Sequence, residues 1–269
     1  FVLVTVSVLV TTYVFVPAIF TQVHPIAAIS PLTLVVRDLE GVAVSAGTAA
    51  FSTIPVGVVA ATLFALGLGL YREEDLFAQL PVPAKVLDAL ANPIRRPRSA
   101  ALLSALSIPF VFVAELLSVA VLFVLPYGFA LPVLLLAIAG IEEVAKSLHV
   151  YAGFERAKYD RSLRTALLVG AASGAGFFLA EKVAAVAQLV GLVDLELGRA
   201  AFQLGAGTGG STSPLLLAVL LLAPLVLHTV TACLSAVGAS RNRRSYLLAL
   251  GAAVVVHAVY NYTVVTNLG

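Results

Sequence analysis

Residues 130–153 read ALPVLLLAIAGIEEVAKSLHVYAG, an apolar run whose central part carries Glu142, Glu143 and Lys146. A run of this length can cross a lipid bilayer as a helix, because about 20 apolar residues span the hydrocarbon core. Charged side chains in such a helix are costly and usually face the interior of the protein. The run therefore predicts a transmembrane helix that carries a functional site near its middle.

Further runs of the same kind occur on both sides of this one. Each is long enough to span as a helix, which satisfies its own backbone hydrogen bonds in lipid. Together they predict an all-α polytopic membrane protein with about seven transmembrane helices, at approximately Phe1–Phe20, Val44–Leu70, Ala101–Leu125, Ala130–Gly153, Thr165–Val190, Pro214–Ala239 and Tyr246–Thr266.

Composition supports this class and excludes others. Hydrophobic residues make up 61% of the chain and charged residues 11%, whereas a soluble domain is roughly 25% charged. A net charge of +2 without a basic face argues against a nucleic-acid partner. The single cysteine, Cys233, excludes a disulfide framework. The lipid bilayer is the expected environment of the chain.

Lysine and arginine gather in every second loop of the predicted topology. The basic segments are 71–99, 154–164 and 240–245, and the loops between them hold few cations. Because basic loops stay on the cytoplasmic side, we predict that Phe1 is cytoplasmic and that Gly269 lies outside.

Six charged residues and two histidines fall inside the predicted spans: Glu115, Glu142, Glu143, Lys146, Glu181, Lys182, His228 and His257. Counted from the cytoplasmic helix ends, the Glu142–Glu143 pair lies ~16 Å deep at 1.5 Å per residue. His228 and His257 fall at about the same depth. Glu181 comes out at ~24 Å, so its helix would need a kink near Gly170–Gly176 to bring it level.

Carboxylates and imidazoles at one depth favour a metal site, because zinc binds both groups and activates water in catalytic sites. Adjacent glutamates point about 100° apart on a helix. One of Glu142 and Glu143 would therefore bind the ion while the other acts as a base, and the sequence leaves their order open. Lys146 follows both by one turn and can pair with either. Asn261 shares a helix face with His257 and could polarise a substrate carbonyl.

At this point the chain resembles a known family. The segments GIEEVAK (140–146), FFLAE (177–181) and HAVYN (257–261), with His228 on a span of its own, resemble the ordered motifs of PrsW-type intramembrane proteases. These belong to the superfamily of CAAX-prenyl endopeptidases and bacteriocin-immunity proteins. The resemblance covers residues 131–266, so we divide the chain into 1–125, a three-helix segment without a motif, and 126–269, a PrsW-like four-helix core.

The resemblance implies an intramembrane metal-dependent endopeptidase of a prokaryotic plasma membrane, with a membrane-anchored protein such as an anti-sigma factor as its substrate. The site that we predict contains a zinc ion held by Glu143, Glu181, His228 and His257. Glu142 and Asn261 are the expected catalytic residues, and Lys146 and Glu115 are expected to be accessory.

Several readings stay open beside this one. Glu115 lies outside the motifs and is expected to pair with Lys182 or Lys146, and His149 is expected near the membrane interface. A serine protease that uses Ser173 with His257 leaves the glutamates unexplained. The alternative functions are a non-catalytic scaffold, or partner subunit of a larger membrane complex, and a proton or ion pathway, since intramembrane acids and histidines also serve relays.

Overall fold

The computed structural model describes residues 31–70, 81–122, 126–191 and 214–268, and every element in these ranges is an α-helix. The all-α prediction is therefore confirmed for this part of the chain. Two helices are short, α4 (Pro31–Leu39) and α7 (Val82–Ala91). The long helices are α5 (Ala46–Leu70), α8 (Ser99–Leu122), α9 (Tyr127–Glu155), α10 (Leu163–Gly191), α12 (Pro214–Arg241) and α13 (Arg243–Leu268).

Each long helix covers one of the predicted spans, while the first predicted span, Phe1–Phe20, lies outside the described residues. Four helices are long and apolar enough to cross a membrane, in the stretches Ala46–Ala65, Leu163–Ala184, Leu222–Arg241 and Arg243–Thr266. In α8 the described apolar stretch is Ser99–Glu115, and α9 carries the charged residues of its central turns. These four apolar helices indicate a membrane protein.

Polar side chains fix the points at which three of the long helices begin. The backbone N–H of Thr48 donates to Ser45 Oγ at 3.1 Å, before α5. Ser162 accepts from the Thr165 N–H in the same way before α10, and Asn242 Oδ1 accepts from the Ser245 N–H at 2.9 Å before α13. Such caps satisfy backbone donors that have no partner within the helix.

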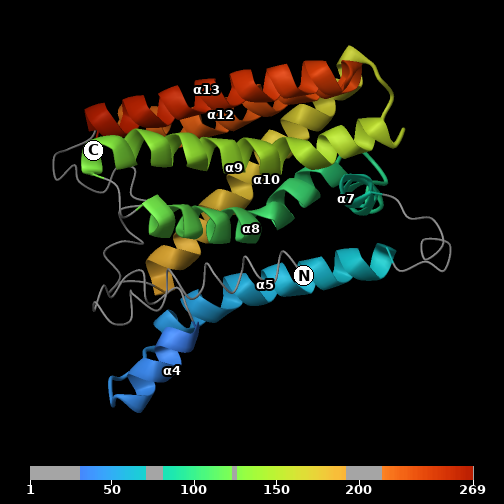
Figure 1. Cartoon of the computed structure of the whole chain (residues 1–269). Coiled ribbons are helices and arrows are strands. Elements are labelled where there is room, and N and C mark those ends of the chain that lie inside the picture. Colours follow the sequence, from blue (N-terminus) through green and yellow to red (C-terminus); the bar gives the residue numbers. More distant parts are fainter. Residues whose placement is uncertain (1–30, 71–80, 123–125, 192–213, 269) are drawn as a thin grey trace.

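Five helices, α8, α9, α10, α12 and α13, pack into one bundle, and α5 lies on its outer side against α8 (Figure 1). α10 runs obliquely across the bundle and contacts both α8 and α12. The basic α9–α10 loop, the basic α12–α13 turn and α7 lie at the same end (Figure 1). Because α8 belongs to this bundle, helices from both sides of residue 125 build the region around the charged residues.

Glycines allow α10 to approach its neighbours closely. A Cβ atom on Gly174 would lie 2.4 Å from the backbone oxygen of His228 on α12, and one on Gly170 would lie 2.6 Å from Cys233 Cα. On the opposite side, a Cβ atom on Gly176 would lie 2.3 Å from the backbone oxygen of Ala101 on α8. Small residues four apart, here Gly170 and Gly174, permit this contact between helices.

Candidate metal centre

Five helices bring ionisable side chains together in the middle of the bundle. We call the group the Glu/His cluster. It consists of Glu115 from α8, Glu142, Glu143 and Lys146 from α9, Glu181 from α10, His228 from α12 and His257 from α13. Glu143, Lys146, His228 and His257 are almost completely buried. Such groups are retained in an apolar interior only when they have partners.

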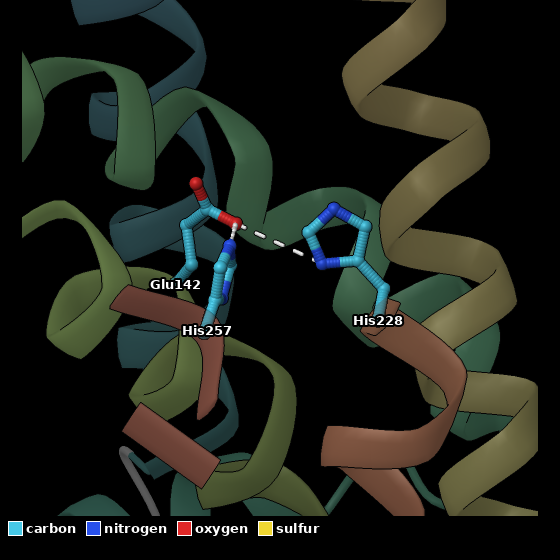
Figure 2. A group of neighbouring side chains, drawn as sticks. All are labelled: Glu142, His228 and His257. Atoms are coloured by element: carbon cyan, nitrogen blue, oxygen red, sulfur yellow. Dashed lines mark ion pairs between the residues drawn. The ribbon is translucent and has the colours of Figure 1, made fainter. Parts of the chain in front are cut away.

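Three members of the cluster point toward one another (Figure 2). Glu142 Oε2 lies 3.8 Å from His228 Nδ1 and 3.7 Å from His257 Nε2. One ligand atom from each of these three residues lies within 4.8 Å of the other two. Ligand atoms around a tetrahedral zinc ion are about 3.5 Å apart when each bond is about 2.1 Å long, so the three groups need to move only slightly to bind one ion.

Glu143 holds the ring of His257 in the orientation that this arrangement requires. The Glu143 Oε1 atom lies 2.7 Å from His257 Nδ1. A carboxylate oxygen can only accept, so Nδ1 carries the proton and Nε2 keeps a lone pair. That lone pair faces Glu142 Oε2. A carboxylate behind a ligating histidine is the usual support of a protein metal site.

Glu181 supports His228 in the corresponding way, with the two ring nitrogens exchanged. His228 Nε2 donates to Glu181 Oε2 at 3.0 Å, which leaves the lone pair on Nδ1. This lone pair accepts a hydrogen bond from Lys146 Nζ at 2.7 Å. The same ammonium lies 2.7 Å from Glu143 Oε1 and 4.0 Å from Glu142 Oε2. Lys146 therefore contacts His228 and both adjacent glutamates, and Glu143 links it to His257.

Two carboxylate oxygens of the cluster are buried without a hydrogen-bond partner, Glu142 Oε2 and Glu143 Oε2. Leaving such an acceptor unpaired costs about 1–3 kcal/mol, and more for a charged group. Glu142 Oε2 is the atom that faces the two imidazole nitrogens. A cation bound between these three atoms would supply the missing partner, so the donor set fits a divalent metal ion such as zinc.

The structure arranges the two adjacent glutamates differently from the ligand set that we predicted. Glu142, the expected base, faces the histidine nitrogens, whereas Glu143, an expected ligand, is engaged by His257 and Lys146. Glu181, also an expected ligand, contacts the outer nitrogen of His228. Neighbouring helix positions point in different directions, and the sequence did not say which of the two faces α12 and α13.

Glu181 reaches the cluster although the sequence placed it deeper in the membrane than the other site residues. The depth assumed a helix perpendicular to the membrane, and α10 runs obliquely across the bundle (Figure 1). An oblique helix gains depth more slowly per residue, so no kink is needed for Glu181 to reach His228.

Glu115 lies closer to the other carboxyl groups of the cluster than its expected accessory role suggested. The carboxyl group of Glu115 lies near those of Glu142 and Glu181. The expected pairing of Glu115 with Lys182 or Lys146 is not seen, because Lys182 Nζ binds Glu181 Oε1 at 3.1 Å and Lys146 binds Glu143 and His228.

Asn261 lies one turn from His257 on α13 and is partly buried, but the described residues show no hydrogen bond between its amide and the cluster. Its expected role toward a substrate carbonyl stays a prediction. The side chain of Cys233 is partly exposed, and its Sγ donates to the backbone oxygen of Leu167 at 3.5 Å.

A second polar group, the His149 layer, lies beside the cluster and consists of Ser104, His149 and Ser173. His149 is buried within the protein, with Nε2 3.1 Å from the backbone oxygen of Ala100, and its expected place near the membrane interface stays a prediction. Ser173 Oγ donates to the backbone oxygen of Lys146 at 2.7 Å. His257 is engaged by Glu143 instead, which argues against a serine nucleophile with His257 as its base.

Comparison with known proteins adds no further assignment. No family model, no curated protein and no solved structure matches this chain. The resemblance to PrsW-type proteases therefore depends on the four sequence motifs, and the functional argument depends on the geometry of the Glu/His cluster.

Proposed function

We propose that this protein is an intramembrane metal-dependent endopeptidase of the PrsW type that cleaves a membrane-associated protein. The observation that carries the proposal is the convergence of Glu142 Oε2, which has no hydrogen-bond partner, with a nitrogen lone pair on His257 and the inner nitrogen of His228. Two histidines and one carboxylate are a recurrent ligand set of catalytic zinc. The proposal includes the seven-helix topology, with its basic loops in the cytoplasm.

Each residue of the cluster has a distinct task in this proposal. Glu142, His228 and His257 would hold the ion, which when bound would polarise the scissile carbonyl and activate water. Glu143 and Glu181 each bind one ring nitrogen of a histidine and so keep the other unprotonated, Nε2 of His257 and Nδ1 of His228.

We assign proton transfer to Glu115. It is the one carboxyl of the cluster for which the described residues show no histidine or lysine partner. Its carboxyl group lies near those of Glu142 and Glu181, beside the three ligand atoms. A carboxyl group in this place can take a proton from water and return it to the leaving amine, which is the usual duty of a general acid and base.

A cleavage assay tests the proposal. The purified protein in liposomes is given membrane-anchored candidate substrates, with and without a chelator, beside the variants Glu142→Gln and Glu155→Gln. Glu142→Gln removes a ligand charge and should lower the rate by at least about 100-fold, because residues that act as a unit lose most of their effect together. Glu155→Gln changes an exposed glutamate on the same helix and should retain activity. Chelator-resistant cleavage, or an active Glu142→Gln protein, would refute the mechanism.

A further inference from the structure

Lys146 lies where its charge bears directly on metal binding. Its ammonium group is completely buried, 4.9 Å from the centre of the Phe177 ring. It contacts His228 Nδ1 and Glu143 Oε1, each at 2.7 Å. An ammonium group has only donors, so His228 Nδ1 accepts this bond with its lone pair.

The lone pair on His228 Nδ1 is also the one that a metal ion would use. The other ring nitrogen donates to Glu181, so a neutral His228 has no second lone pair to offer. A bond to Lys146 and a bond to a metal therefore exclude each other at this atom. Coulomb repulsion adds to the competition, because an ammonium and a dication would lie side by side in a medium of low dielectric constant.

The cluster also contains a second acceptor for Lys146. Glu143 Oε2 is buried without a hydrogen-bond partner, and it belongs to the carboxylate that Lys146 already contacts through Oε1. A small rotation of the lysine side chain would exchange the His228 contact for Glu143 Oε2. The ammonium would stay paired, and His228 Nδ1 would become free.

We propose that Lys146 is a resident cation that competes with the metal ion for His228 Nδ1. Without metal it balances the carboxylates and keeps the ring of His228 in its ligand orientation. With metal it withdraws onto Glu143. Lys146 thereby sets the affinity of the site, and metal occupancy depends on a local rearrangement of one side chain. This inference rests on the metal site of the proposed function.

Zinc titration of the full chain in detergent, followed by calorimetry, tests the inference. Lys146→Met removes the charge and the donor while keeping an unbranched side chain of similar length. It should bind zinc at least about tenfold more tightly than the wild type, because a competing bond and a repulsive charge are lost. The control Lys182→Met removes a neighbouring cation that contacts Glu181 and none of the three ligand atoms. Its affinity should stay within about threefold of the wild type.

The outcomes separate the two claims. Equal zinc affinity in the wild type and Lys146→Met would overturn the competition and leave the metal site standing. Zinc binding by Lys146→Met alone would support the competition and contradict a metal enzyme in the wild type. Absence of zinc binding in both proteins would overturn both. If Lys146→Met does not fold, Lys146→Gln replaces it, and an affinity no higher than that of the wild type would count equally against the inference.

Discussion

The Glu/His cluster and the His149 layer are both buried and both polar, yet they differ in how their groups are satisfied. His149 Nε2 lies 3.1 Å from the backbone oxygen of Ala100 and Nδ1 lies 3.2 Å from that of Ala145, and a neutral ring donates its single N–H to one of these oxygens. Ser173 links α8, α9 and α10 through Ser104 and the Lys146 carbonyl. In the described residues, none of the side-chain atoms that lack a hydrogen-bond partner belongs to this layer, whereas two belong to the Glu/His cluster.

This difference separates packing from chemistry. Polar groups that satisfy one another hold membrane helices together. A cluster that leaves an acceptor unpaired beside two imidazole nitrogens is instead arranged to bind a further group, such as a metal ion. Burial and residue type alone do not make this distinction, because His149 and His257 are almost equally buried, at 3% and 2% exposure. The carboxylate oxygens that lack a hydrogen-bond partner beside His228 and His257 make the distinction.

The largest expected effect is the loss of metal when His257 is changed. His257→Ala removes one of the three ligand atoms and should weaken zinc binding by at least about 100-fold, since changing an outer partner alone costs 10–100-fold. His149→Ala should destabilise the bundle but keep the zinc affinity within about threefold. Calorimetry on both variants measures the contrast. Similar losses in the two proteins would show that the cluster and the layer do not differ in function.

A second, intermediate effect concerns the helix contact that positions His228. Gly174→Val would drive a side chain into the backbone of α12 and should lower the free energy of unfolding by about 2 kcal/mol. The control Gly140→Val lies on α9, where a Cβ atom would meet nothing within 4 Å. Unfolding of both variants in increasing concentrations of a denaturing detergent provides the measurement. Equal stability of the two variants would contradict the close contact between α10 and α12.

The smallest effect should come from the His149 layer itself. Ser173→Ala removes the hydroxyl that donates to the Lys146 carbonyl, and should cost about 1 kcal/mol of stability. Zinc affinity should be unchanged, because no ligand atom contacts Ser173. The same unfolding and calorimetric measurements apply. A loss of zinc binding without a loss of stability would mean that the layer belongs to the site.

The sequence predicted the helices and the residues of the Glu/His cluster. Both predictions depend on signals that can be read from residue types alone, the length of an apolar run and the cost of burying a charge. The sequence could not rank Glu142 above Glu143, since that order depends on the rotation of α9 relative to α12 and α13. Glu115 was expected to be only accessory because its helix carries no motif, although α8 packs directly against α9. The contact of His149 with the Ala100 carbonyl on α8 could not be predicted, because a backbone partner is not identifiable from residue types.

The central claim is that Glu142, His228 and His257 bind one divalent ion, and metal analysis of the purified protein tests it most directly. After equilibration with zinc and removal of the free ion, the wild type should retain about one zinc per chain, as a single three-residue site requires. The double variant His228→Ala/His257→Ala should retain essentially none. A wild type without zinc, or a double variant that retains as much as the wild type, would contradict the account.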